Sequence, residues 1–432
     1  MCQSLESGAQ PHVLLLATQP WPTGARLGLA LHAVGFRVSI WSPRSHPLLK
    51  TTAADRHYPY LAIGQGSLEA AIIAANPHLI VPCDDPATAR LQQLAQSALV
   101  DSRLHRVLDL IERSLGPAAG LSKFTARAYV LEVAAKGGVA VPPTARLTSS
   151  ADLLAWLREY GFPAYLKADG TFGGTGVRHV HTFQQAEAAL RALDAPPRIL
   201  DAVKRLAIDR NPTLIGPSVR RKRSAISVQC AVPGVDVNSA IFCWRGQVLA
   251  SITVKVMATS HERGPSTVVR RIRNAAMDHA AEVLASRLKL TGFYGLDFIL
   301  DGPSEDERSG SLWLIEMNSR ATQIAHLALG PGHDLAAAAF SAIGGVPLHP
   351  RPLLTTKDTI ALFPQEWERD PNSPLIRSAY HDVPWDAPSL VRTYVNQRPG
   401  LRVLTRGFWR HRRQRKQNFE GSTSPETAAR LP

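Results

Sequence analysis

Two apolar segments in the last third of the chain are interrupted by polar residues at specific positions. The segments 293–300 and 312–318 have the composition of β-strands, and the polar, glycine-containing connector between them indicates an antiparallel hairpin. If Leu300 pairs with Trp313, the polar positions of the two strands come together on one face of the sheet. The spacing therefore predicts a cluster of side chains rather than isolated polar residues.

The predicted cluster consists of hard oxygen ligands. In this register Asp297 lies opposite Glu316, and the period of two places Asn318 on the same face. Two facing carboxylates are unfavourable unless a positive charge neutralises them, and carboxylate and amide oxygens left open to phosphates are what Mg²⁺ uses. The alternative is a polar pair on a solvated sheet face, which the surrounding apolar residues disfavour.

A glycine-rich loop lies between two further strand-like segments, 163–167 and 177–181. Its backbone N–H groups can approach phosphate oxygens, and Lys167, at the end of the first segment, can reach the same phosphates. The alternative is a flexible hairpin tip with an ordinary surface lysine. The sequence contains neither the P-loop pattern GxxxxGK[ST] nor the HRD and DFG elements of a protein kinase. The four glycines of the loop are Gly170, Gly173, Gly174 and Gly176.

A third strand-like segment, 225–232, ends in Pro233-Gly234. Such an end offers a carbonyl and an N–H from alternate residues, which can bind the edge of an adenine, and Asp236 could accept from ribose hydroxyls. Taken alone, the same pattern is a strand end followed by a turn.

The first hundred residues alternate short apolar runs with amphipathic stretches, which indicates a parallel sheet with crossover helices. Loops at the carboxyl ends of such strands usually hold ligands. The first loop, 18–24, lacks GxGxxG, so a dinucleotide site is not expected there. The predicted strands are 13–17, 37–41 and 79–81. One predicted helix ends at about Val34, and another covers 67–75.

A second domain is expected to begin near residue 115. Its helices are predicted at 122–136, before the Pro142-Pro143 break, and at 150–160, with Ser149 or Ser150 as the cap. The later segments predict one antiparallel sheet with helices on one side, an α+β arrangement. The strands expected in it are 225–232, 237–244, 248–257 and 267–272, with a helix at 274–288.

Composition limits the class of protein. The 432 residues are 45% hydrophobic, enough for several cores, and the net charge is +14. Much of the positive surplus lies in two short runs, 220–223 and 402–416, so the charge is a local property of one connector and of a basic tail. No apolar run approaches a membrane span, the N-terminus does not resemble a signal peptide, and the four cysteines show no zinc spacing. These features predict a cytoplasmic protein.

Taken in order, these motifs resemble the ATP-grasp superfamily of ligases over residues 11–345. The resemblance implies an α/β plus α+β fold, in which an N-terminal Rossmann-like pre-ATP-grasp domain precedes a two-lobed ATP-grasp fold. The most specific parts are Lys167 with the glycine loop, and Asp297 followed by the run 316–320. The implied domains are 11–114, the N-terminal lobe 115–215, the C-terminal lobe 216–345, an extension 346–400 and a basic tail 401–432.

The resemblance also implies roles for single residues. Asp297, Glu316 and Asn318 would hold Mg²⁺, with Mn²⁺ as an alternative ion, while Arg320 would steady a phosphate or acyl phosphate. Lys255, from its own place near the end of the predicted strand 248–257, could serve as a further phosphate contact. A structural salt bridge for Arg320 and a solvated strand-end position for Lys255 are the competing interpretations. The residues implied at ATP are Lys123, Lys167, Gly173, Gly174, Gly176, Gln229, Cys230, Val232 and Asp236.

The chain departs from the family pattern at three places. Gln229 and Asp236 stand where family members often have Glu, and Ser319 stands where they often have Pro. The amide and the shorter acid keep the hydrogen-bonding roles, so ATP affinity is expected to change without being lost. Three nearby residues of a polar loop, His261, Glu262 and Arg263, and also His326, are interpreted as ordinary surface or helix-cap residues rather than catalytic bases.

The reaction implied by the resemblance begins with attack of a carboxylate on the γ-phosphate of Mg-ATP. The acyl phosphate is then captured by an amine or similar nucleophile, giving an amide, ADP and phosphate. Amino acids are the substrates suggested by the family alone, and the oligomeric state stays open. The alternatives are a carbamoyl- or carboxyl-phosphate-forming enzyme, or an ATP-binding module whose basic tail binds nucleic acid or an anionic membrane.

Overall fold

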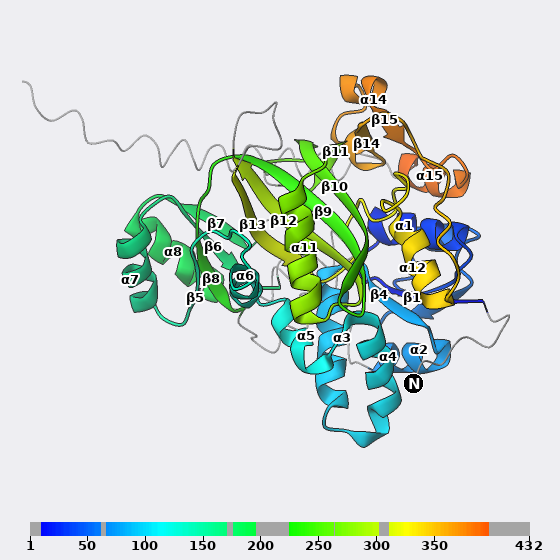
Figure 1. The fold of residues 1–432 in the computed structure, drawn as a ribbon, viewed down its shortest axis with the longest axis horizontal. Coiled ribbons are helices and arrows are strands. Elements are labelled where there is room, and N and C mark those ends of the chain that lie inside the picture. The colour runs from blue at the N-terminus through cyan, green and yellow to red at the C-terminus, as the bar shows by residue number, and fades with distance from the viewer. Residues whose placement is uncertain are drawn as a thin grey trace, which may run out of the picture. The chain divides into compact units, whose positions relative to one another are not determined.

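The computed structural model describes residues 10–61, 66–170, 176–195, 224–262, 264–301 and 311–396 (Figure 1). The chain divides into two compact units, with the boundary in the sequence between Val383 and Pro384. In the second unit the described residues form one helix, α15 (Pro388–Val395). Gly173, Gly174, the basic run 220–223 and the tail 401–432 lie outside the described residues, so their predicted roles stay predictions.

The N-terminal region forms a parallel sheet of four strands in the order β3-β2-β1-β4. The predicted strands and crossover helices are present, because buried apolar runs alternate with amphipathic stretches. One strand, β3, was not predicted, since it is a four-residue edge strand with no buried residue. The elements are β1 (His12–Leu16), α1 (Pro22–Ala33), β2 (Arg37–Ser42), η1 (Pro47–Lys50), β3 (Arg56–Pro59), α2 (Gly66–Ala75) and β4 (Leu79–Pro82).

Four helices lead from this sheet to the next region. The predicted helix over 122–136 is wrong as a single element, because the chain breaks at Thr125 and Ala126. The break starts a new helix at Arg127. The helices are α3 (Asp85–Ala98), α4 (His105–Leu115), α5 (Ala118–Phe124) and α6 (Arg127–Ala135), with the short turn η2 (Ser102–Leu104) between α3 and α4.

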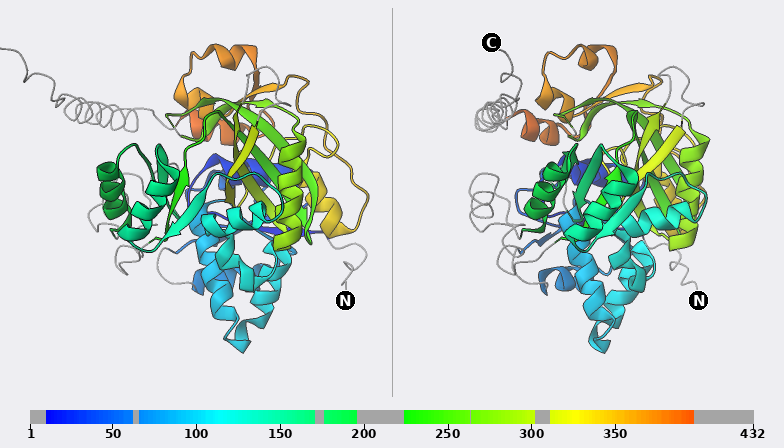
Figure 2. Two further views of the ribbon diagram at one scale, coloured as in Figure 1. Left: turned by 60° about the vertical axis from the view of Figure 1, so that its left-hand side comes forward. Right: turned by 90° about the vertical axis from the view of Figure 1, so that its left-hand side faces the viewer.

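A second sheet has four antiparallel strands in the order β5-β8-β6-β7. Its apolar face packs on α7 (Ser150–Tyr160) and α8 (Phe183–Asp194), which lie together against it in Figure 2. The predicted cap of α7 is confirmed, since the Ser149 side chain accepts from Asp152 N in a capping box. The strands are β5 (Thr144–Leu147), β6 (Ala164–Ala168), β7 (Val177–Val180) and β8 (Ile226–Cys230).

The position of β8 differs from the prediction. The strand was expected in the same sheet as the later strands, but it pairs with β5 and β6, on the other side of the predicted boundary at 215. Its alternation of apolar and polar residues fits either sheet. Pairing with a strand some 60 residues earlier is a tertiary contact, which local pattern does not specify.

The third sheet has seven strands in the order β13-β12-β9-β10-β11-β14-β15. The Pro-rich extension supplies its last two strands, β14 antiparallel to β11 and β15 parallel to β14. The strands are β9 (Val235–Trp244), β10 (Gln247–Thr259), β11 (Ser266–Arg271), β12 (Gly292–Asp301), β13 (Ser311–Asn318), β14 (Thr359–Leu362) and β15 (Tyr380–Asp382). The helices that accompany it are α11 (Ala275–Leu288), α12 (Leu335–Gly344), α13 (Gln365–Arg369) and α14 (Pro374–Ser378).

The two faces of the seven-stranded sheet differ. Tyr294, Leu296 and Phe298 are buried on the face covered by α11, which crosses the sheet in Figure 1. The alternate residues of β12, including Asp297, point to the opposite face. The second face is mixed: Phe293 and Phe242 are buried on it at one end of the strands, and Asp297 and Asn238 lie on it further along.

Candidate active site

The predicted carboxylate pair is present. Asp297 of β12 lies opposite Glu316 of β13, and Asn318 pairs with Gly295 on the same face. The register is not uniform along the hairpin, because an irregularity beside Asp297 makes Leu300 pair with Leu312 and not with Trp313 as predicted. The predicted pairing is therefore correct at the polar cluster and wrong by one residue at the far end.

Amide side chains hold Asp297 from both sides. Asn318 Nδ2 donates to Asp297 Oδ2 at 2.8 Å, and the Asn238 amide donates to Oδ1. Asn238 is opposite Asp297 on β9, so the three side chains come from three adjacent strands. Each of these donors stabilises the negative charge of Asp297.

The two carboxyl groups have different affinities for a proton. Burial, and next the charge of Glu316, raises the pKa of Asp297 to about 6, although its amide donors work against this shift. Burial also acts to raise the pKa of Glu316, but Arg127 and Lys167 hold that pKa below its ordinary value. A single added proton therefore goes to Asp297, and two negative charges side by side call for a cation.

Arg127 was not predicted as a site residue. It is the first residue of α6 and only 7% exposed. Its Nη2 lies 2.7 Å from Glu316 Oε1, and its Nη1 lies 3.2 Å from Asp169 Oδ1. The guanidinium therefore bridges a carboxylate of the seven-stranded sheet and a carboxylate beside the glycine loop.

Lys167 lies on the polar face of the four-stranded sheet. Its ammonium donates to Gln229 Oε1 at 2.5 Å, and Gln229 Nε2 donates to Thr144 Oγ1 at 3.1 Å. Burial, and next the charge of Arg127, lowers the pKa of Lys167 to about 8, while Glu316, Asp297 and Asp236 act to raise it. The charges of acids on the other sheet thus act on this ammonium, whose hydrogen-bond partner is the neutral Gln229 amide.

The base of the glycine loop is well defined. Ala168 N donates to Gly176 O, and Asp169 N donates to Ala225 O, so the loop leaves and rejoins paired strands. Gly170 has φ +73°, a conformation that favours glycine. Burial raises the pKa of the Asp169 carboxyl to about 6, against the lowering by Arg127.

The end of β8 carries the predicted adenine-binding segment. The Cys230 N–H is already bonded to Pro143 O at 3.0 Å, which leaves its carbonyl as the group that could contact a base. Val232 is partly exposed, and Asp236 is exposed at the start of β9. Asp236 pairs with Ile299 and therefore shares a face with Asp297.

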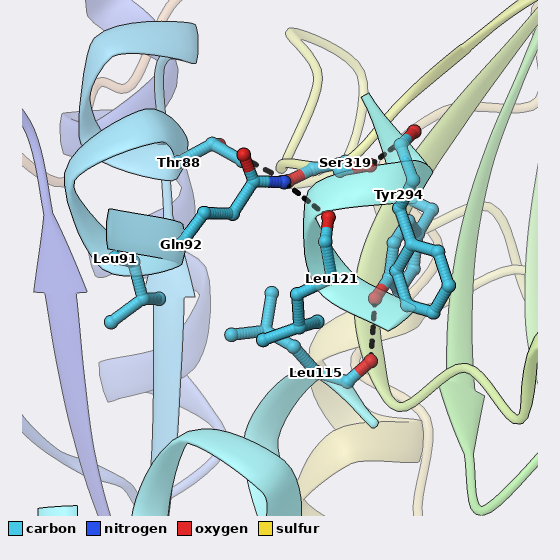
Figure 3. A pocket seen from close by; sticks show the side chains of 8 residues that line it. Thr88, Leu91, Gln92, Leu115, Leu121, Tyr294 and Ser319 are labelled. Atoms are coloured by element: carbon cyan, nitrogen blue, oxygen red, sulfur yellow. Dashed lines mark hydrogen bonds between the residues drawn. The ribbon is translucent and has the colours of Figure 1, made fainter. Parts of the chain in front are cut away.

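Arg320 makes the salt bridge that was its competing interpretation. Its Nε lies 3.0 Å from Asp85 Oδ1 at the start of α3, and its Nη2 is 3.4 Å from Asn318 Oδ1. Ser319 also contacts the first region, because its carbonyl accepts from Thr88 Oγ1 at 3.1 Å. Beside this contact lies a small, mainly apolar cavity, whose lining includes Thr88, Tyr294 and Ser319 (Figure 3). The loop after β13 is thus fixed to α3.

The two remaining predicted phosphate contacts lie on α5 and β10. Lys123 is exposed on α5, with Nζ 5.5 Å from the centre of the Tyr129 ring. Lys255 is buried on β10, where it pairs with Val237, whereas its neighbour Val254 pairs with Asn238. The register therefore puts Lys255 on the opposite face from Asp297.

His326 is not the surface residue that was expected. It is 8% exposed, and its Nε2 lies 2.6 Å from Asp382 Oδ2. The same Asp382 carboxylate binds Arg26 of α1. These three buried side chains connect the first helix, the loop after β13 and the extension, so the role of His326 is structural.

The donor set fits a hard divalent cation completed by phosphates. No group of three or more His, Cys, Asp or Glu side chains within the described ranges could enclose a metal ion. Two carboxylates and an amide are what a site needs when phosphate oxygens and water supply the rest of an octahedron. Asp297, Glu316 and Asn318 are therefore the residues that would hold Mg²⁺.

Three site residues were missed, namely Arg127, Asp169 and Asn238. Asp169 lies between Lys167 and the first loop glycine, and Asn238 alternates with Asp236 along one strand. Both positions could have been found from the period of two. Arg127 carried no such signal, because its partners are 42 and 189 residues away in the sequence.

Sequence comparison finds partial matches. No protein-family model matches the chain. A segment of 95 residues is 34% identical to phosphoribosylamine–glycine ligase of Escherichia coli O6:H1 and 33% identical to the protein of that description from strain K12. These matches cover 22% of the chain and 22% of each ligase, so the chain matches about a fifth of the length of these curated relatives.

Solved structures match over most of the chain. Carboxyaminoimidazole ribonucleotide synthase of Aspergillus clavatus, complexed with ATP, has a TM-score of 0.55 at 16% identity, covering 80% of this chain and 79% of that one. Biotin carboxylase of Campylobacter jejuni has a TM-score of 0.55 at 14% identity, covering 79% and 72%. The chain therefore has the ATP-grasp fold, with the predicted Rossmann-like N-terminal sheet before it. None of the described helices has both the length and the apolar composition of a membrane-spanning helix.

Proposed function

We propose that this protein is an ATP-dependent ligase that activates a carboxylate as an acyl phosphate and joins it to an amine. The single observation that carries the proposal is the facing pair Asp297 and Glu316 on one sheet of an ATP-grasp fold, whose charges act on the buried Lys167 ammonium of the other sheet. A protein that only binds nucleotide has no need for a carboxylate pair beside a phosphate-binding lysine. Phosphoryl transfer needs both, because it depends on positioning and charge neutralisation.

Each side chain has a task in this reaction. A divalent cation, when bound, would neutralise charge on the transferring phosphoryl group. Asp297, Glu316 and Asn318 would orient that cation, while Lys167 and the glycine loop would bind the phosphates. Gln229 fixes the ammonium of Lys167 through a neutral hydrogen bond, so the positive charge stays directed at an anion.

The adenosine end would lie at the end of β8. The Cys230 carbonyl and the backbone of Val232 would bind the adenine, and the Asp236 carboxylate would accept from the ribose. Arg320 is held by Asp85, and its remaining N–H groups could steady an acyl phosphate. Closure of the loop over the nucleotide would protect that intermediate from hydrolysis.

The experiment supplies purified protein with Mg-ATP and pools of amino acids whose carboxylates carry ¹⁸O. The proposal expects ADP, an amide product of the corresponding mass, and one ¹⁸O atom in the released phosphate, because the carboxylate oxygen attacks phosphorus. Glu316→Gln is the control that should remove all three signals. Product formation with unlabelled phosphate, or formation of AMP, would contradict the acyl phosphate.

A second candidate is formation of carboxyphosphate from bicarbonate. It is favoured by the fold similarity to biotin carboxylases, one of which, the biotin carboxylase domain of a Hydrogenobacter thermophilus 2-oxoglutarate carboxylase, was solved with MgADP and bicarbonate at a TM-score of 0.53 and 14% identity. Phosphate release that requires bicarbonate, and does not respond to any amino acid pool, would favour this reaction over the ligase.

A further inference from the structure

The bridge formed by Arg127 has a consequence for cation binding. We propose that Arg127 is a positioning residue that acts as an internal counter-ion: it holds Glu316 until a divalent cation arrives with nucleotide, and then stays bound to Asp169. The inference rests on the proposed metal role of Glu316 and Asp297. It adds a condition to that role, namely that the site binds a divalent cation well only together with nucleotide.

The first step of the argument is competition for one carboxylate. Glu316 Oε1 receives Arg127 Nη2 at 2.7 Å, whereas a Mg²⁺ ligand approaches to about 2.0–2.1 Å. A cation bound to that oxygen displaces the guanidinium, and two positive groups on one carboxylate repel each other. A free divalent cation must therefore either break this ion pair or bind the same carboxylate against the repulsion of the guanidinium.

The second step is the presence of a second partner. Arg127 Nη1 lies 3.2 Å from Asp169 Oδ1, so the guanidinium keeps a carboxylate when it leaves Glu316. Without such a partner a buried arginine would be left as an unpaired charge, which is costly. The Nε of Arg127 is buried and has no hydrogen-bond partner among the described residues. The guanidinium is therefore held through its two Nη atoms alone.

The third step concerns the helix. Arg127 begins α6, and the first turn of α6 contains no acidic residue. A positive charge at a helix N-terminus opposes the helix dipole, so this arginine does not stabilise its own helix. Its charge is compensated across space by Asp169 and Glu316 instead.

The fourth step links the bridge to the phosphates. Asp169 precedes Gly170 at the base of the glycine loop, and Glu316 faces Asp297. The guanidinium therefore connects the phosphate-binding side to the cation-binding side. Because phosphates bring their own negative charge, nucleotide and cation together can replace the ion pair, whereas the cation alone gains less.

The test measures binding of Mn²⁺ alone to the full chain, from the loss of the free Mn²⁺ signal in electron paramagnetic resonance. Arg127→Gln removes the competing cation, so Mn²⁺ should bind about tenfold tighter than to the wild type. The matched control is Arg146→Gln, which removes an exposed arginine that acts on Asp169 by its charge and is not part of the bridge to Glu316. It should leave the affinity within about twofold of the wild type.

If the role of Arg127 were purely structural, replacing it would not raise the affinity for Mn²⁺. Arg127→Lys keeps the charge but cannot bind two carboxylates with a planar fork, so an intermediate gain is expected, and it serves as the test if Arg127→Gln does not fold. Unchanged or weaker Mn²⁺ binding in the folded Arg127 variants, or an equal gain in Arg146→Gln, would overturn the proposal.

Two further variants separate this inference from the proposed function. Glu316→Gln and Asp297→Asn should abolish the Mn²⁺ binding seen in Arg127→Gln. If they do and Arg127→Gln shows no gain over the wild type, only the counter-ion role is wrong. If Mn²⁺ binding persists without both carboxylates, the metal assignment itself is wrong.

Discussion

The two sheets that carry the site hold their charges in opposite ways. On the four-stranded sheet, the Lys167 ammonium donates to the neutral amide of Gln229. On the seven-stranded sheet, Glu316 is bound by a guanidinium, and Asp297 accepts from two amides. The Lys167 cation is therefore bound by a neutral partner, while one of the two acids, Glu316, already has a counter-ion.

This difference is visible in the proton affinities. The pKa of Lys167 is lowered to about 8 and the pKa of Asp297 is raised to about 6, in both groups first because of burial. Each shift marks a charged form that the protein environment destabilises. An anion beside Lys167 would raise its pKa again, and a cation beside Asp297 would lower its pKa again. A nucleotide with its divalent ion would supply both charges.

The largest effect is expected from the carboxylate side. Asp297→Ala or Glu316→Ala should abolish ATP turnover, a loss of at least about a thousandfold, because the cation loses an oxygen ligand. Phosphate release measures the loss, and circular dichroism checks that the fold is intact. A variant with full activity would show that the acids are not needed for a cation.

The next effect is expected from the cation side. Lys167→Met should weaken ADP binding about tenfold to a hundredfold, because the buried ammonium is replaced by an apolar group of similar length. Isothermal titration calorimetry measures the affinity, and the exposed Lys136→Met is the matched control. Equal affinities in the two variants would remove Lys167 from the nucleotide site.

A third effect is the pH dependence of nucleotide binding. Below pH 8 Lys167 is protonated and can bind phosphate, and above pH 8 it must first gain a proton, so ADP affinity should fall as pH rises through about 8. Gln229→Glu places a carboxylate beside the Lys167 ammonium, which raises the pKa of Lys167. The decrease in ADP affinity should then occur at higher pH. A profile that is flat between pH 7 and 9 in both proteins would contradict the neutral-partner interpretation.

A smaller effect concerns the loop after β13. Asp85→Ala removes the partner of Arg320, and both side chains are partly exposed, at 23% and 17%. The free energy of unfolding should fall by only about 1 kcal/mol, while the turnover rate changes severalfold because Arg320 is no longer held. Urea unfolding and steady-state kinetics separate the two, and Asp55→Ala, at a long surface ion pair, is the control.

The smallest effect at the site is expected for Lys255. The sequence predicts a phosphate contact, but the register puts this lysine on the face opposite to Asp297. Lys255→Met should therefore change ADP affinity by less than about twofold, although stability can change because the side chain is buried. A large loss of ADP affinity in the folded variant would return Lys255 to the site.

Much of the fold was predictable from local pattern. The helix at 150–160 carries its own cap and first-turn acid, and the strands of the N-terminal sheet are short buried apolar runs. The short edge strand β3 carried no buried residue, and the partner of β8 lay outside any local window. Elements with a strong local signal were found, and those defined by distant neighbours were not.

For the site, the sequence by itself determined the pairing of Asp297 with Glu316 and the place of Lys167 before its loop. Both follow from hairpins, in which turn and alternation decide which side chains meet. Only the tertiary structure decided that Arg127 bridges Asp169 and Glu316, and that Arg320 binds Asp85. Those contacts join segments 42, 189 and 235 residues apart, whose approach depends on the packing of whole sheets and helices rather than on any local preference.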